Sequence, residues 1–361
     1  MLTPLRLPTV YQQPIQLLPA EFSAPPAAYS LVYPAVGFLP FDDLGNGDEY
    51  GCYWPLGKEE HDPLVAMSSR YCGTLGPIGS CLKSFYLTAC ARYGDDADEN
   101  EDDEGESFAS VSCLHRFLQS ARQQVASPEE IPRLDSADYE RLLELDPRSP
   151  HLQTARADQL LSDGDAEQAE GLYRQAIATL PEYTAAHYGL AMACRRQRKV
   201  DLAAWHFLAA IRNPVSFDGR SFWFEALLNA PMRYNWRKKS LDMLKRLPTR
   251  QQDAVADDPL FAVLGRLSFA YGVKNNDDYG LYEQVINSYL EAGRPLDAIL
   301  LWMLYGELMG FETVSFRERY GFSEQTFGER LFSLFQAAGL KRRALLLHDM
   351  ILRLDCAKWR R

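Results

Sequence analysis

The larger, C-terminal part of the chain has the hydrophobic pattern of paired helices. From Phe108 onward, apolar residues recur at intervals of three and four, which is typical of helices that bury one face. Tyr139, Tyr173 and Phe207 are separated by 34 residues each time. Small residues keep the same interval, from Ala169 to Ala203 and from Ala176 to Ala210. The pattern predicts a helical array over residues 135–361.

The 34-residue interval and its residue types resemble the tetratricopeptide repeat, in which each unit is a pair of helices. The resemblance places Gly164 at the turn within one pair, Tyr173 between neighbouring pairs and Pro181 at the end of the second helix. Arg198 stands where the next unit would have its turn glycine. Residues 292–298 and 338–344 repeat the turn pattern, but they are 46 residues apart and predict less regular units.

Stacked helix pairs form a curved superhelix whose concave surface usually binds proteins or peptides. The resemblance assigns five first-helix positions to that surface: Thr154, Asp158, Tyr188, Met192 and Arg195. Tyr188 and Arg195 are candidate partner-binding residues. Relatives that bind chaperone tails carry a clamp of Lys and Asn there, and Arg195 alone is basic, so that specific activity is not expected. A purely structural scaffold is the alternative.

The N-terminal part is patterned for strands. Residues 1–40 are rich in proline and aromatic residues, which favours extended segments over helix. Residues 49–54 and 63–67 have the composition of strands, and the glycines of residues 45–48 predict a turn before the first. Residues 82–93 then predict a helix. The expected fold is therefore a small α+β domain at residues 1–125, with an antiparallel sheet and helices, followed by an all-α helical-repeat domain at residues 126–361.

Aromatic residues of the first predicted strand have two interpretations. Alternation along a strand puts Tyr50 and Trp54 on one face and Tyr53 on the other. These side chains either form the core of the sheet or leave one aromatic face exposed as an interaction hot spot. Tyr53 and Trp54 are therefore candidate partner-binding residues.

Charge is concentrated at one end of the chain. The net charge is −11, and residues 1–134 account for all of it, since residues 135–361 carry equal numbers of acidic and basic residues. The segment 94–107 predicts a disordered or solvated acidic loop. We expect its nine carboxylates either to steer a basic partner or to act only as a solvated loop: Asp95, Asp96, Asp98, Glu99, Glu101, Asp102, Asp103, Glu104 and Glu106.

Several classes of function are disfavoured by the sequence. A net negative charge argues against nucleic acid as a partner. No apolar run has the length of a membrane helix, and the start of the chain lacks a secretory signal, so a cytoplasmic protein is expected. The seven cysteines have no C-x-x-C spacing, and no phosphate loop, calcium loop or catalytic constellation is present. We expect no enzyme, metal, cofactor or small-molecule substrate; His187 and His206 are expected to approach each other only as structural residues.

The stretch from Phe38 to Trp54, with its Gly45-Asn46-Gly47-Asp48 turn, resembles the SUKH superfamily. A strand such as residues 63–65 and a helix such as residues 84–87 follow in that family. The resemblance implies binding: its members are mostly bacterial immunity proteins that block a toxin. We therefore expect a cytoplasmic immunity protein that neutralises a cognate toxin by occlusion, in particular a secreted antibacterial effector of type VI kind such as a nuclease. The alternative is an adaptor or chaperone that holds a secreted protein on its helical-repeat surface.

Overall fold

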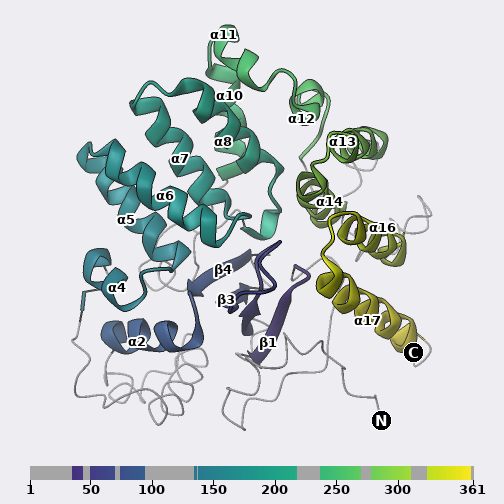
Figure 1. Cartoon of the computed structure of the whole chain (residues 1–361), viewed down its shortest axis with the longest axis horizontal. Coiled ribbons are helices and arrows are strands. Elements are labelled where there is room, and N and C mark those ends of the chain that lie inside the picture. The colour runs from purple at the N-terminus through teal and green to yellow at the C-terminus, as the bar shows by residue number, and fades with distance from the viewer. Residues whose placement is uncertain are drawn as a thin grey trace, which may run out of the picture.

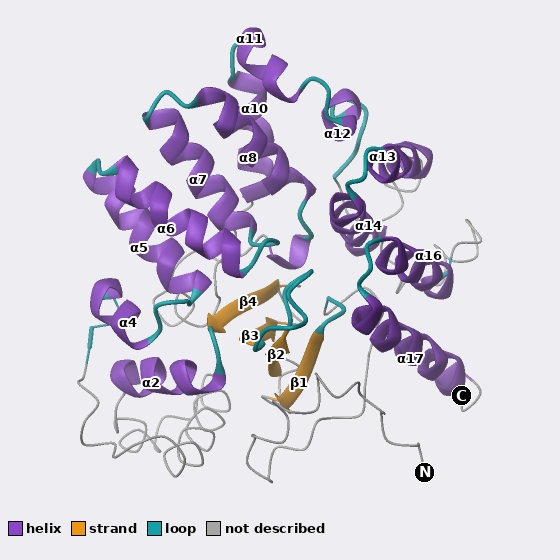
Figure 2. Ribbon diagram, in the orientation of Figure 1, coloured by secondary structure: helices purple, strands orange, loops and turns teal. Residues whose placement is uncertain are grey.

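The computed structural model describes residues 35–43, 49–69, 74–93, 134–135, 137–217, 236–269, 278–309 and 323–358. In it, a small sheet lies between two groups of helices (Figures 1 and 2). The predicted turn at residues 45–48, the acidic loop at residues 94–107 and the domain boundary at residues 125 and 126 lie outside the described residues. The division of the chain at that boundary stays a prediction.

The sheet has four antiparallel strands in the order β1-β2-β3-β4. Their bounds are Phe38–Asp43, Glu49–Tyr53, Leu64–Ser69 and Thr74–Gly79. Helix α2, Leu82–Tyr93, follows and packs against β4 and β3. The predicted strands and the predicted helix are thus confirmed. Strand β4 was missed because Gly76 and Pro77 interrupt its sequence; Pro77 is compatible with a strand here because β4 lies at the edge of the sheet.

The first group of helices, here called the first arm, contains the 34-residue pattern. Tyr173 and Phe207 lie on α6 and α8 and are fully buried, as are the alanines that share their interval. Tyr173 packs against Gly189 of α7, so it fills the gap between two helix pairs as predicted. The arm consists of α4 (Tyr139–Leu145), α5 (Pro150–Asp163), α6 (Ala166–Thr179), α7 (Thr184–Arg196), α8 (Val200–Arg212) and α10 (Trp236–Arg246).

The second group, here called the second arm, is built from two more helix pairs. Its members are α13 (Tyr279–Glu291), α14 (Pro295–Met309), α16 (Glu324–Ala337) and α17 (Lys341–Lys358). Short helices join the arms at the top of Figure 1: α11 (Thr249–Gln252), η4 (Asp253–Val255) and α12 (Pro259–Val263). The helix pairs predicted at residues 292–298 and 338–344 are confirmed.

All four helix pairs turn in the same way. Each turn has one residue with positive φ, at Gly164, Arg198, Gly293 and Gly339. After each of these residues, the next backbone N–H donates to a carbonyl five residues earlier, for example Lys199 to Cys194. This αL ending satisfies carbonyls that the last helical turn leaves without partners. Arg198 adopts a conformation that favours glycine. The turn therefore keeps the same backbone geometry although the glycine of the repeat pattern is replaced by arginine.

The sheet and the two arms share one hydrophobic core. Short helix η3, Val215–Phe217, connects the parts, because it contacts β4 and also α14 of the second arm. The ring of Phe217 lies 5.2 Å from that of Tyr53 on β2. The predicted fold class, a small α+β part followed by a helical array, is therefore correct, and the two parts pack together over a continuous interior.

Candidate interaction face on the first arm

Helix α7 presents three of the residues predicted to line the concave surface. Tyr188, Met192 and Arg195 follow one another at intervals of four and three, so they lie on one side of the helix. All three are half-buried. The Arg195 guanidinium lies 3.6 Å from the Met192 sulfur, which confirms that these two side chains meet.

Helix α10 extends this surface. The ring of Tyr188 lies 4.8 Å from that of Trp236, and Arg195 lies 3.7 Å from the sulfur of Met243. The two contacts are seven residues apart along each helix, from Tyr188 to Arg195 and from Trp236 to Met243, so α7 and α10 run parallel. We call Tyr188, Met192, Arg195, Trp236 and Met243 the interaction face.

Helix α5 borders the face at two other predicted positions. Thr154 is buried, and Asp158 accepts a hydrogen bond of 2.5 Å from the Tyr173 hydroxyl. Burial raises the pKa of Tyr188; the nearby Arg195 cation opposes this shift, and the Asp158 carboxylate adds to it. The face therefore combines apolar groups with one cation and a nearby carboxylate.

Aromatic and methionine side chains beside an arginine are typical of protein-binding surfaces. Tyr, Trp, Met and Arg are enriched at interface cores, and Met adapts its shape to different partners. Lys239 lies 4.3 Å above the ring of Trp236, in a cation–π contact. Sequence reasoning found the α7 residues but missed Trp236 and Met243, because they fall 48 residues after Tyr188 and Arg195 rather than 34.

The other predicted partner-binding residues lie elsewhere. Tyr53 and Trp54 are 1% and 0% exposed, and Tyr50 is buried as well. Of the two interpretations, the core of the sheet is correct and the exposed interaction face is wrong: Tyr50 packs towards Phe85 of α2, and Tyr53 faces Phe217 on the opposite side. The nine acidic residues between Asp95 and Glu106 lie outside the described residues.

A buried polar network explains the position of Tyr53. Its hydroxyl donates to the carboxylate of Glu182, at a distance of 2.8 Å, and the Leu56 N–H donates to the same oxygen. Glu182 lies in the loop between α6 and α7 and belongs to the first arm. Burial raises the pKa of the Glu182 carboxyl, while the neighbouring Arg343 cation lowers it.

Arg343 attaches the second arm to the same part of the sheet. It is fully buried at the start of α17, donates to the carbonyl of Trp54 and forms an ion pair of 2.8 Å with Glu59. Its guanidinium also lies 5.8 Å from the centre of the Tyr53 ring. Tyr53 is therefore a structural residue, held between one anion of the first arm and one cation of the second.

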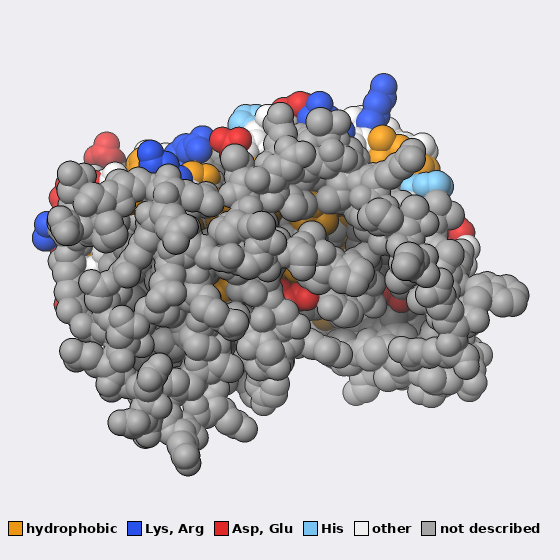
Figure 3. All heavy atoms as spheres, turned by 90° about the horizontal axis from the view of Figure 1, so that it is seen from below, with side chains coloured by type: hydrophobic (Ala, Val, Ile, Leu, Met, Phe, Trp, Pro, Cys, Tyr) orange, Lys and Arg blue, Asp and Glu red, His pale blue; other side chains and the backbone are white. Residues whose placement is uncertain are grey.

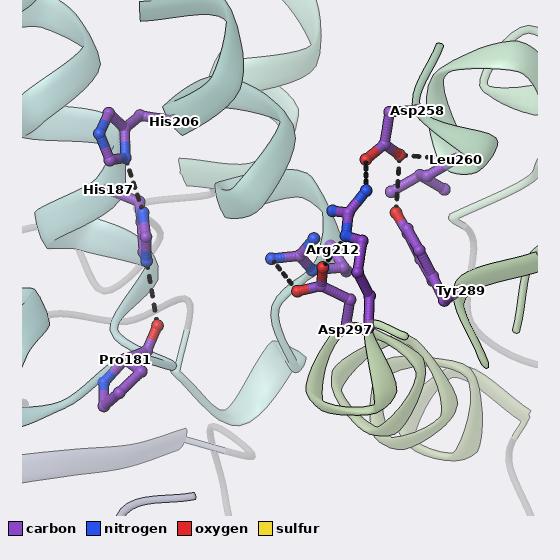
Figure 4. Close-up of polar contacts among 9 residues, drawn as sticks. Pro181, His187, His206, Arg212, Asp258, Leu260, Tyr289 and Asp297 are labelled. Carbon is purple, nitrogen blue, oxygen red and sulfur yellow. Dashed lines mark hydrogen bonds and ion pairs between the residues drawn. The ribbon is translucent and has the colours of Figure 1, made fainter. Parts of the chain in front are cut away.

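The two histidines singled out from the sequence do meet. His187 of α7 and His206 of α8 approach to 3.2 Å between their Nδ1 atoms, and His187 Nε2 lies 3.0 Å from the Pro181 carbonyl (Figure 4). A carbonyl only accepts, so His187 Nε2 carries the proton and its Nδ1 accepts from His206. Burial lowers the pKa of His187 to about 3 and that of His206 to about 4. Both rings are neutral at neutral pH and join α7 to α8.

A second buried network connects the two arms (Figure 4). Asp258, at the start of α12, accepts hydrogen bonds from the Tyr289 hydroxyl and from Arg294. Arg294 also pairs with Asp297 of α14, and Asp297 pairs with Arg212 of α8 at 2.8 Å. Asp258 is fully buried, the other three side chains are partly exposed, and each charge has an opposite partner, so this cluster is a structural joint.

Metal binding and membrane insertion have no support in the described part of the chain. Among the residues that the structure describes, no three His, Cys, Asp or Glu side chains are grouped closely enough to hold a metal ion. Within the same residues, no helix combines the length and the apolar character needed to cross a membrane.

Comparisons with known proteins found similarity to YfbP. A family model described as the YfbP N-terminal domain matches residues 21–123, and one described as the YfbP C-terminal domain matches residues 269–345. The curated relative "Uncharacterized protein YfbP" of Escherichia coli (strain K12) is 26% identical over 305 residues, which cover 81% of this chain and 84% of the relative. The first matched region includes the sheet and α2, the second includes most of the second arm, and the interaction face lies between them.

Proposed function

We propose that the chain is a non-catalytic binding protein that holds a partner polypeptide on the interaction face. The observation that carries this proposal is the meeting of Tyr188, Arg195, Trp236 and Met243 on two parallel helices, α7 and α10. Tyr188, Met192, Arg195 and Met243 are half-buried and leave surface that a partner would cover, whereas Trp236 beside them is buried. The resemblance to tetratricopeptide arrays, which use the same side of their first helices, supports the same function.

Site-specific photo-crosslinking in the cells that naturally make the chain tests the proposal. A photoreactive amino acid at Met192 should give a discrete cross-linked protein, whereas the same group at Ala178, exposed on α6, should not. The product should disappear when Tyr188→Ala is added. Equal products at both positions, or none at Met192, would contradict a binding site on this face.

Toxin immunity is the narrower form of this proposal. Its support is the SUKH resemblance, together with the order of two antiparallel strands, a third strand and a later helix α2 in the structure. In this form the protein acts in the cytoplasm and blocks a toxin, and the acidic first third of the chain would meet a basic surface of that toxin. Cells that express the product of the neighbouring gene should die without the chain and survive with it. If the chain binds that product and leaves its toxicity unchanged, the adaptor function replaces immunity.

A further inference from the structure

Positive charge gathers beside the interaction face, at the end where α7 and α10 both terminate. The helices run parallel, so their C-terminal residues lie at the same edge of the first arm. Residues 195–199 and 236–250 carry ten Lys and Arg and a single acid, Asp242, within a chain whose net charge is −11. We call five of these cations the basic edge: Arg195, Arg196, Arg198, Lys245 and Arg246.

The basic edge is not neutralised by the described residues. Arg196, Arg198, Lys245 and Arg246 are all exposed, and no described carboxylate forms an ion pair with Arg198, Lys245 or Arg246. The neighbouring Lys199, in contrast, pairs with Glu170 at 2.7 Å. Cations at helix C-termini are favoured by the helix dipole, but this accounts for an isolated cation rather than a continuous group.

One edge of the molecule shows described charges of both signs. Seen from below, the described Lys, Arg, Asp and Glu side chains are interspersed along the edge of the view (Figure 3). Residues 195–199 and 236–250, in contrast, carry ten cations and one acid. Repulsion among these cations would be relieved by an acidic partner.

We propose that the interaction face binds an acidic segment of a partner polypeptide. This inference rests on the proposed function and adds the chemistry of the partner. Apolar residues of the segment would pack on Tyr188, Met192 and Met243, and its carboxylates would pair with the basic edge, where arginine can form two hydrogen bonds to one carboxylate. The partner on this face is thus opposite in charge to the basic partner expected from the acidic first third of the chain.

Selection of peptides on the full-length chain tests the inference. Random twelve-residue peptides displayed on phage are selected against the immobilised protein, and the enriched peptides are synthesised. We expect them to combine Asp or Glu with apolar residues. Their affinity should fall at least tenfold between low and high salt, because screening weakens exposed charge pairs.

Charge-reversed variants locate the binding site. Arg195→Glu, Lys245→Glu and Arg246→Glu together should weaken binding of the selected peptides at least tenfold. A matched control carries the same change in net charge at exposed residues elsewhere: Lys83→Glu, Arg141→Glu and Lys341→Glu. It should bind as the unchanged protein does, and circular dichroism shows that both variants fold.

The outcomes separate the inference from the function on which it rests. Selected peptides that lack acidic residues, yet lose binding when Tyr188→Ala is introduced, would overturn the acidic partner and leave the binding face. Selected peptides that bind both triple variants equally would overturn the inference. A random-sequence single-stranded RNA that binds the basic edge more tightly than any selected peptide would assign this edge to nucleic acid instead. If no peptides are enriched, the acidic partner is also rejected, and the cross-linking at Met192 decides the function separately.

Discussion

In both arms, an aromatic ring packs against a glycine where neighbouring helix pairs meet, but the two residues lie on opposite helices in the two arms. In the first arm, Tyr173 of α6 packs against Gly189 of α7; in the second, Phe327 of α16 packs against Gly306 of α14. A Cβ atom at Gly189 would lie 2.2 Å from the tyrosine ring, and one at Gly306 would lie 2.3 Å from the phenylalanine ring. Both contacts join the second helix of one pair to the first helix of the next. The contact needs one aromatic residue and one glycine, but either helix can supply either residue.

The arms also differ in how much of their central helices is exposed. Helix α7 leaves Tyr188, Met192 and Arg195 half-exposed, whereas nearly every residue of α14 from Ala298 to Met309 is buried. Helix α14 is covered because it packs on α13, α16, α8 and η3. A helix that is apolar all round is a core element. Under the proposed function, the first arm therefore presents the binding surface, and the second arm supports it.

The largest expected loss of stability comes from the buried contacts that attach each arm to the sheet, Arg343 in the second arm and Glu182 in the first. Arg343→Met should lower the free energy of unfolding by roughly 3–5 kcal/mol, because it leaves Glu59 as a buried, unpaired charge. Glu182→Gln should cost only about 1–3 kcal/mol, since an amide oxygen can still accept from Tyr53. Urea denaturation measures both. Equal losses would mean that the two attachments are equivalent.

The second prediction concerns how the free energy of unfolding changes with pH through one buried carboxyl of the second arm. Glu307 of α14 accepts from the Val215 and Ser216 N–H groups, and burial raises its pKa to about 7 from 4.5. The folded protein therefore holds a proton that the unfolded chain has lost between pH 4.5 and 7. The contribution of Glu307 is fully present below pH 4.5 and decreases by about 3 kcal/mol as the pH rises to 7.

Glu307→Gln removes this titration while keeping an acceptor for the two N–H groups. The stability of the variant relative to the unchanged chain should therefore increase between pH 5 and 7 and level off above it. Subtracting the free energy of unfolding of the unchanged chain from that of the variant cancels the contributions of other titrating groups. One of these is His187, whose lowered pKa makes stability rise with pH, opposite to the effect of Glu307. A difference that stays constant with pH would show that Glu307 is ionised throughout this range.

Alanine substitutions at glycines test the exchanged packing directly. Gly189→Ala and Gly306→Ala should each lower the free energy of unfolding by about 1–3 kcal/mol through overpacking. Gly171→Ala on α6 is the matched control: nothing lies within 4 Å of its added Cβ, so it should stabilise the helix by about 1 kcal/mol. In a Tyr173→Ala background, the cost of Gly189→Ala should disappear. If that cost persists, the two residues do not form the contact.

The smallest expected effect concerns the one turn that lacks glycine. Arg198 has a φ of 62°, the conformation that glycine adopts at the other three turns. Arg198→Gly should therefore raise the free energy of unfolding by about 1 kcal/mol. Gly164→Ala should have the opposite sign. A loss of stability in Arg198→Gly would mean that the arginine side chain contributes more than its backbone conformation costs.

The spacing of residues along the chain predicted part of this fold, and the prediction was better for the first arm than for the second. The 34-residue interval identified Tyr173 and Phe207 correctly, because both are fully buried on the second helix of successive pairs. It did not reach α10, whose Trp236 continues the face after a longer connection, or Phe327, whose packing role is exchanged with a glycine. Helical spacing therefore predicted the first arm in detail and the second only at its glycine turns.

The candidate site was predicted in part for similar reasons. Tyr188 and Arg195 were found because repeat register fixes the side of a helix that faces the concave surface. Tyr53 stayed a candidate for the surface because alternation alone cannot tell that both faces of the sheet are covered. The basic edge was hidden because residues 135–361 have no net charge, so only the parallel arrangement of α7 and α10 brings its cations together.

Hydrogen exchange tests most directly whether the first arm is the binding element. Amide exchange is measured on the full-length chain with and without a saturating acidic peptide from the selection. We expect slower exchange in α7 and α10, and unchanged exchange in α13, α14 and α16. Protection confined to the second arm, or peptide binding without any protection of α7 and α10, would contradict a first arm that presents the partner-binding surface and a second arm that supports it.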